Sequence, residues 1–191
     1  MRFLNYYLYK GRRVALVAKF SAFNLEKVEL SMELDTNIND ARILIVDDKP
    51  ANVALLEAIL KGEGYTNVQS VTDSRLLEDL HDKWQFDIIL LDIRMPHMSG
   101  FDVMALLQEK IEDDYLPILV LTAQSDVETK IKALQNGARD FVTKPFERIE
   151  VTHRIKNMLE VRLMYIKRGW EKELVEAQVR ERTQQLAETQ L

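Results

Sequence analysis

The 191-residue chain contains no cysteine, only 4 Pro and 6 Gly, and no apolar run of the roughly 18 residues that a membrane-spanning helix needs. Without cysteine it cannot hold a disulfide, a zinc–thiolate centre, an iron–sulfur cluster or a cysteine nucleophile. The three histidines, His81, His97 and His153, are too scattered to suggest a histidine-based metal site. With 47% hydrophobic residues the chain can build a core, and its length suits one domain with an appendage or two very small domains.

Charge is unevenly distributed along the chain. The formal net charge is −5, but residues 41–149 alone carry 12 basic and 19 acidic side chains. An acidic segment is not the basic footprint of direct nucleic-acid binding, and it is better suited to gathering carboxylates around a hard cation. We therefore expect no direct nucleic-acid partner. Because the chain has no spanning segment and no cysteine, we also expect no membrane partner and a cytoplasmic location.

The middle of the chain alternates strand-like and helix-like segments. Stretches with helical spacing separate five short apolar runs, which are residues 43–46, 68–71, 88–91, 118–121 and 141–142. Unbroken runs of Ile, Leu and Val are typical of strands buried on both faces. A helix is predicted to begin at Pro50, and another at Ser99, where Asp102 completes a capping box. The alternation predicts an α/β fold over residues 41–159, a doubly wound five-stranded parallel sheet with right-handed crossovers.

The C-terminal segment favours one long helix. It is dense in Glu, Arg, Lys, Gln and Leu, and Ile155, Leu159, Leu163 and Ile166 share one stripe. We interpret residues 160–191 as a helical linker that forms a coiled coil and thereby a homodimer. A solvated terminal helix on a monomer is the alternative.

Residues 1–40 form an N-terminal extension with a different character. Residues 1–20 carry five basic and no acidic side chains, and their apolar stretch is too short for a signal-peptide core. Met32 stands shortly before the predicted domain. We therefore interpret residues 1–31 as a disordered tail or as an extension from a misassigned start codon, with a basic aromatic arm on a membrane surface as a further alternative.

Polar residues follow the predicted strands where these end: Asp47 and Asp48, then Asp92, Thr122 and Lys144. In a parallel sheet these positions meet at the carboxyl edge. A single Asp in such a place is usually a helix cap, but five polar residues at strand ends are hard to explain that way. Three adjacent carboxylates repel one another and favour Mg²⁺, while a lysine and a hydroxyl can bind phosphoryl oxygens. An ionised Asp in this setting can attack phosphorus and form an acyl phosphate.

The segment from about Arg42 to Leu159 resembles the receiver domain of bacterial two-component response regulators. The resemblance rests on ILIVDDKPAN, DIILLDIRMPHMSGFDVM, PILVLTA and GARDFVTKPF, which follow one another in the receiver order. It implies that Asp92 is the phosphoacceptor, which receives its phosphoryl group from a histidine kinase or a histidine phosphotransfer protein. It also implies that Thr122 and Lys144 bind this group, and that Phe141 is an aromatic switch that turns inward as Thr122 moves.

The same resemblance implies how the receiver is built around its cofactor. Mg²⁺ would be held by Asp47, Asp48, Asp92 and the main-chain carbonyl of Arg94. The Lys144–Pro145 bond would be cis, which costs little for an X-Pro bond. No stand-alone enzyme is expected, only self-catalysed phosphotransfer and dephosphorylation at Asp92.

The tail LEVRLMYIKRGWEKELVEAQVRERTQQLAETQ resembles the linkers between receivers and cyclic-di-GMP phosphodiesterase domains of the HD-GYP type. A cyclic-di-GMP output domain is therefore expected, and no G-Y-P motif of such a domain occurs in this sequence. The chain is then a piece of a longer regulator or a stand-alone dimerising receiver adaptor. A magnesium-dependent aspartyl-phosphate phosphatase of the haloacid dehalogenase type is the alternative. Its general acid would stand two residues after the nucleophile, where Arg94 cannot donate a proton at ordinary pH.

Overall fold

A computed structural model describes residues 2–9, 12–20, 28–33, 37–110, 114–123 and 127–189. The chain divides into two compact units. One contains residues 36–162, and the other contains residues 1–35 and 163–191. Among the described residues no helix is both long enough and apolar enough to cross a membrane.

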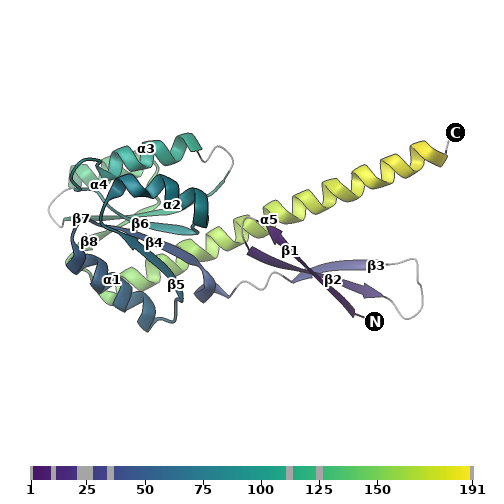
Figure 1. Cartoon of the computed structure of the whole chain (residues 1–191), viewed down its shortest axis with the longest axis horizontal. Coiled ribbons are helices and arrows are strands. Elements are labelled where there is room, and N and C mark those ends of the chain that lie inside the picture. Colours follow the sequence, from purple (N-terminus) through teal and green to yellow (C-terminus); the bar gives the residue numbers. More distant parts are fainter. Residues whose placement is uncertain are drawn as a thin grey trace. The chain divides into compact units, whose positions relative to one another are not determined.

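The larger unit is built on a five-stranded parallel sheet (Figure 1). Its strands, in the spatial order β5-β4-β6-β7-β8, are β5 (Asn67–Val71), β4 (Arg42–Val46), β6 (Ile88–Asp92), β7 (Ile118–Ala123) and β8 (Asp140–Lys144). The helices are α1 (Pro50–Gly62), α2 (Leu77–Trp84), α3 (Gly100–Lys110), α4 (Val127–Gln135) and α5 (Arg148–Thr189), with the short 3-10 helices η1 (Ile38–Asp40) and η2 (Ser74–Leu76). The predicted doubly wound sheet and long C-terminal helix are confirmed.

The apolar runs are buried because helices cover both faces of the sheet. Side chains alternate along a strand, so Ile43 of β4 points to the face covered by α1 and α5, and Leu44 points to the face covered by α2, α3 and α4. Both residues are fully buried. A strand that is buried on both faces has no side chains exposed to solvent and therefore needs no alternating polar residues. This explains why β4, β6 and β7 appear in the sequence as unbroken apolar runs.

The predicted helix starts are also present. Pro50 occupies the first turn of α1, where its missing N–H costs no hydrogen bond. At α3 the Asp102 carboxylate accepts a hydrogen bond of 2.9 Å from the Ser99 backbone N–H, and the Asp102 N–H donates to the Ser99 hydroxyl at 3.3 Å. This is the reciprocal geometry of a capping box. The bonds from Ser99 hold the pKa of Asp102 below its usual range.

The amino edge of the sheet, where the strands begin, carries a buried ion network that the sequence analysis did not predict. Arg162 of α5 is only 3% exposed, and its guanidinium donates to Asp114 at 2.5 and 3.0 Å and to the Tyr115 carbonyl at 2.5 Å. Asp87, just before β6, lies 3.9 Å from Arg162 and accepts a 2.8 Å bond from the Arg42 backbone N–H. We refer to Arg42, Asp87, Asp114 and Arg162 as the amino-edge network.

The smaller unit contains a three-stranded antiparallel sheet of β1 (Arg2–Tyr9), β2 (Arg12–Phe20) and β3 (Val28–Glu33), in the order β1-β2-β3. Leu16 of β2 pairs with Met32 of β3. A disordered tail was one interpretation of residues 1–31, whereas the described residues of this segment form strands. Backbone pairing across two antiparallel connections supplies the hydrogen bonds that a disordered segment would make to water.

Candidate functional site

Strand register brings two of the predicted aspartates together. Val46 of β4 pairs with Leu91 of β6, so the next residues, Asp47 and Asp92, follow side by side on neighbouring strands. Asp47 is fully buried and Asp92 is 4% exposed. The carboxyl edge of the two central strands therefore holds two carboxylates that are almost completely shielded from water.

Lys144 contacts both of these carboxylates, although it belongs to β8, the strand at one end of the sheet. It ends β8, where it is in register with Ala123 of β7. Its ammonium group lies 2.7 Å from Oδ2 of Asp47 and 3.0 Å from Oδ1 of Asp92. The Lys144–Pro145 bond is cis, as predicted. Thr122, one residue before Ala123, is 4% exposed at the same edge.

Asp48 completes a cluster that suits a hard cation. One carboxylate oxygen from each of Asp47, Asp48 and Asp92 lies within 4.8 Å of the others. Oδ1 of Asp48 is buried and has no hydrogen-bond partner among the described residues. Mg²⁺ prefers oxygen ligands, and an orphaned buried carboxylate oxygen is costly without a partner. The donor set and its unsatisfied oxygen therefore fit Mg²⁺.

The surroundings of Asp92 disfavour its charged form. Burial raises the pKa of Asp92 above its usual range, and the nearby Asp47 carboxylate adds to this effect. The Lys144 ammonium opposes the rise, as does a hydrogen bond from the Arg94 backbone N–H. An additional cation at this edge would favour the ionised carboxylate, which is the form that can act as a nucleophile.

The Asp47 carboxylate is held by more donors than Lys144 alone. Its Oδ1 accepts bonds from the Lys49 backbone N–H at 2.9 Å and from the Asn52 amide at 3.0 Å. The same Asn52 nitrogen lies 2.9 Å from Oδ2. Asn52 was not among the site residues predicted from the sequence. The signal that could have found it is an amide side chain in the first turn of a helix that begins directly after a strand-end aspartate.

The backbone of Asp92 is in close contact with the start of α3. A Cβ atom at Gly100 would lie 2.5 Å from the Asp92 carbonyl oxygen and 2.9 Å from Cα of Ile93. The Gly100 N–H also donates to the Ile93 carbonyl at 3.0 Å. Only glycine allows this approach, so the chain directly after the site is packed against the helix that follows it.

Phe141, the predicted switch residue, lies in β8 and is half-buried. The Lys130 ammonium lies 5.0 Å from its ring centroid, and the Arg154 guanidinium lies 5.9 Å from it. Arg154 also pairs with Asp140 at 2.5 Å and with Glu150 at 2.8 Å. The ring is therefore flanked by two cations from α4 and α5, an arrangement that the sequence analysis did not foresee.

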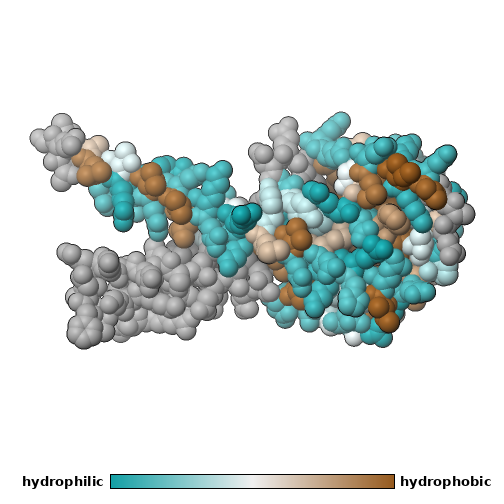
Figure 2. Space-filling model, turned by 180° about the vertical axis from the view of Figure 1, so that it is seen from behind, coloured by the Kyte–Doolittle hydropathy of each residue, from teal (hydrophilic) through white to brown (hydrophobic). Residues whose placement is uncertain are grey.

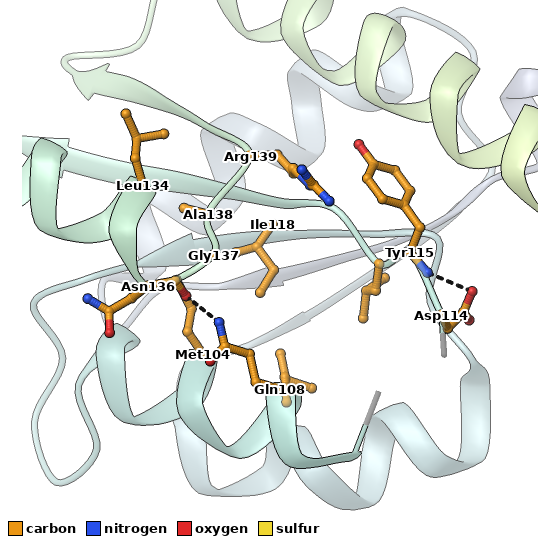
Figure 3. Close-up of a pocket in the computed structure, with 12 residues that line it drawn as sticks. Met104, Gln108, Asp114, Tyr115, Ile118, Leu134, Asn136, Gly137, Ala138 and Arg139 are labelled. Carbon is orange, nitrogen blue, oxygen red and sulfur yellow. Dashed lines mark hydrogen bonds between the residues drawn. The ribbon is translucent and has the colours of Figure 1, made fainter. Parts of the chain in front are cut away.

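A separate cavity of about 320 Å³ lies near the other edge of the sheet, between α3 and the end of α4 (Figure 3). Two contacts link polar side chains of its lining to other lining residues. Gln108 donates to the Asn136 carbonyl at 2.8 Å, and the Arg139 guanidinium lies 4.6 Å from the Tyr115 ring centroid. Among the described residues, the cluster of three carboxylates lies at the carboxyl edge and not in this cavity.

Comparison with known proteins connects this geometry to one family. Residues 43–156 match the family model described as "Response regulator receiver domain". The chain is 37% identical over 114 residues to the cell cycle transcriptional regulator CtrA of Caulobacter vibrioides, covering 60% of this chain and 48% of that protein. It is also 37% identical over 124 residues to the response regulator PleD of the same species, covering 65% and 27%. The chain thus spans about half or less of these curated relatives.

The chain is also similar to a solved structure of the response regulator class. A putative response regulator from Chloroflexus aurantiacus is 33% identical, with a TM-score of 0.60 over 63% of this chain and 98% of that chain. The matched part in each comparison is no more than about two thirds of the present sequence.

Proposed function

The chain belongs to the response regulator receiver family, and on that premise we propose that Asp92 accepts a phosphoryl group from a histidine kinase or a histidine phosphotransfer protein. The observation that carries the proposal is the position of Lys144, whose ammonium bridges the buried Asp47 and Asp92 at 2.7 and 3.0 Å. Asp92 belongs both to this ion pair and to the cluster of three carboxylates that fits Mg²⁺.

In the proposed reaction, a carboxylate oxygen of Asp92 forms a bond to phosphorus as the bond from phosphorus to the donor's imidazole nitrogen breaks. The leaving nitrogen keeps the electron pair, and the product is an acyl phosphate. Lys144 can shift from the carboxylates to a phosphoryl oxygen as a point charge, and the Thr122 hydroxyl can donate to another. These residues position the group, which is the main help that phosphoryl transfer needs.

Asp47, Asp48 and Asp92 would hold Mg²⁺, with the main-chain carbonyl of Arg94 as a further ligand. Bound Mg²⁺ supplies neutralisation of the charge that gathers around the transferred group. Without it, three carboxylates face a single ammonium at this edge. The protein's own contribution is to keep the ligands close together and shielded from water.

The proposed readout begins at Phe141. When Thr122 moves toward the phosphoryl group, the space beside it opens for the Phe141 ring, which leaves its position between Lys130 and Arg154. Because Arg154 belongs to α5, this movement changes the contacts of the long helix.

We infer further that the chain forms a homodimer through the C-terminal part of α5, from about Val175 to Leu186. Val175, Val179 and Leu186 are 57%, 58% and 66% exposed, and apolar residues recur along this part of the helix (Figure 2). Their spacing of four and seven residues matches one seam of a coiled coil. The helix would carry the signal to an output domain, for which the linker resemblance favours the cyclic-di-GMP class. The proposed location is cytoplasmic.

Incubation with a small-molecule phosphodonor and Mg²⁺, followed by intact mass measurement, tests the acceptor. We expect wild type to gain one phosphoryl group, Asp92→Ala to gain none, and the exposed control Asp79→Ala to gain one. Equal gains in wild type and Asp92→Ala would disprove the assignment.

Sedimentation velocity of the same samples tests the dimer. Val175→Glu with Val179→Glu should yield monomers, whereas Gln178→Glu, which changes charge next to the seam, should leave the oligomeric state unchanged. A monomeric wild type, with and without the phosphodonor, would rule out the dimer and leave the phosphoacceptor untouched.

A further inference from the structure

The Asp47 carboxylate is surrounded by donors on both oxygens. Oδ1 accepts from the Lys49 backbone N–H and from Asn52, and Oδ2 accepts from Asn52 and from Lys144. A carboxylate offers about four lone-pair sites. All of them are therefore engaged in this structure, although Asp47 belongs to the cluster of carboxylates that fits Mg²⁺. One donor has to leave before an oxygen of Asp47 can face a cation.

The three donors differ in their freedom to leave. Lys49 donates from its backbone, which is fixed at the residue preceding α1. Lys144 has a flexible stem and a second acceptor already within reach, Oδ1 of Asp92 at 3.0 Å. Asn52 has a short side chain, and its amide nitrogen spans both oxygens at 3.0 and 2.9 Å. Lys144 is therefore the donor that can yield, and Asn52 is the one that remains.

We propose that Asn52 is a positioning residue of the magnesium site, because its amide fixes the rotation of the Asp47 carboxylate so that Oδ2 faces the ion once Lys144 has moved toward Asp92. Without the amide only the Lys49 N–H would remain to hold the carboxylate once Lys144 has moved, so the carboxylate could rotate further about its Cβ–Cγ bond, and this added freedom would be lost each time the ion binds. Outer-shell partners of metal ligands are typically worth roughly 10–100-fold in metal affinity. The inference rests on the proposed function, since it concerns the same site.

A purely structural role for Asn52 makes different predictions. Asn52 lies in the first turn of α1, where a side-chain bond to Asp47 ties the helix to the end of β4. If that were its only role, its loss would lower the stability of the protein equally with and without Mg²⁺. A positioning role instead lowers the stabilisation that Mg²⁺ adds, because ligand-linked stability depends on affinity.

The test uses the whole chain with Asn52→Ala, a change that suits a helix because Ala has the highest helix propensity. Calorimetric titration with Mg²⁺ should give a dissociation constant roughly 10–100-fold higher than that of wild type. The increase in melting temperature between EDTA and a fixed Mg²⁺ concentration should shrink accordingly. An unchanged dissociation constant, with an equal loss of melting temperature in both buffers, would overturn the proposal.

Two further variants sharpen the test. Asn157→Ala makes the same chemical change at an exposed position of α5, and it should bind Mg²⁺ like wild type. Asn52→Leu restores side-chain volume but supplies no donor, so it should be as weak as Asn52→Ala. Wild-type affinity in Asn52→Leu would show that volume matters and not the amide, and would overturn the proposal. It also carries the test if Asn52→Ala does not fold.

Phosphorylation kinetics separate this inference from the proposed function. With a small-molecule phosphodonor, the Mg²⁺ concentration for half-maximal rate should rise roughly 10–100-fold in Asn52→Ala, while the rate at saturating Mg²⁺ stays within about twofold of wild type. A lower saturating rate with an unchanged half-maximal concentration would overturn the positioning role. A wild type that binds no Mg²⁺ would overturn the magnesium site itself, whereas a wild type that binds it with an indifferent Asn52→Ala would overturn only this inference.

Discussion

The carboxyl edge and the amino edge of the receiver sheet contain the same kinds of residue, but these residues are arranged for different purposes. At the carboxyl edge, Lys144 bridges two buried aspartates. At the amino edge, Arg162 pairs with Asp114 and lies 3.9 Å from Asp87, which is fully buried. Each edge thus places one cationic side chain against two acidic side chains in the interior of the protein.

The difference lies in what remains unpaired. At the amino edge, Asp87 has a second cation nearby, because Arg42 donates to it from both its backbone and its side chain. At the carboxyl edge, a third carboxylate joins the set, and Oδ1 of Asp48 has no partner among the described residues. The amino edge leaves a donor, Nε of Arg162, without a hydrogen-bond partner among the described residues, whereas the carboxyl edge has a surplus carboxylate whose unpartnered oxygen fits a cation.

The largest effect is expected at the amino edge. Arg162→Ala removes the buried guanidinium that pairs with Asp114 and leaves Asp87 with Arg42 alone. Breaking a buried pair in this way costs about 3–5 kcal/mol. Arg162→Met fills the space with an apolar side chain but leaves Asp114 charged, so by itself it should lower the free energy of unfolding about as much as Arg162→Ala does. The double variant Arg162→Met with Asp114→Asn should lower it less. Urea denaturation of the three variants measures these free energies of unfolding. A loss below about 1 kcal/mol in Arg162→Ala would place the network among ordinary surface ion pairs.

The next effect distinguishes the carboxyl edge. Mg²⁺ should stabilise wild type by about 2.7 kcal/mol at 100 times its dissociation constant, because it binds the folded state alone. Asp48→Ala should abolish this increment, whereas Arg162→Met should keep it despite a lower starting stability. Thermal melts with EDTA and with Mg²⁺ check both. A magnesium increment that vanishes in Arg162→Met would mean that the two edges are not independent.

A smaller effect concerns pH. The folded-state pKa of Asp92 is raised above 3.8 by burial, so the folded protein binds more protons than the unfolded chain in the interval between those two values. This group's contribution to stability therefore falls as pH rises through that interval, and its penalty is complete above it. In EDTA, the stability of Asp92→Asn relative to wild type should rise with pH from about 3.8 upward. Parallel pH profiles in paired urea denaturations would contradict this.

The smallest effect is expected from Arg42→Ala. Its Nε lies 3.4 Å from Asp87 and its side chain is 16% exposed, while the Arg42 backbone N–H keeps its 2.8 Å bond in the variant. We expect a loss of about 0.5–1 kcal/mol by urea denaturation. A loss as large as that of Arg162→Ala would show that the side chain of Arg42, and not its backbone, holds Asp87.

Structural features that depend on a few consecutive residues could be predicted from the sequence. Apolar runs of fixed length predicted β4, β6 and β7, and the Ser99–Asp102 pair predicted the start of α3, because each is encoded within a few consecutive residues. The gathering of Asp47, Asp92 and Lys144 was also predictable, since every parallel strand ends at the same edge.

Contacts between distant segments were not predictable in this way. Arg162 and Asp114 are separated by 48 residues, and nothing in the pattern of a charged helix indicates which arginine is buried. The Asn52 bond to Asp47 is local, but it depends on the side-chain rotamer. In residues 28–33 the alternation VELSME is typical of a strand. The strand was not predicted, because residues 1–31 were interpreted from the basic composition of residues 1–20 and not from this alternation.

Gly100 has a consequence for how the receiver can respond. Because the Asp92 carbonyl leaves no room for a Cβ at that position, the main chain of Asp92 and the first turn of α3 are in direct contact. If a phosphoryl group is added to Asp92, we expect little movement on the α3 side, so that the adjustment falls to the Asp92 side chain and to β7 and β8. Under the proposed function, Gly100 would in this way favour a response at Thr122 and Phe141 over a movement of α3.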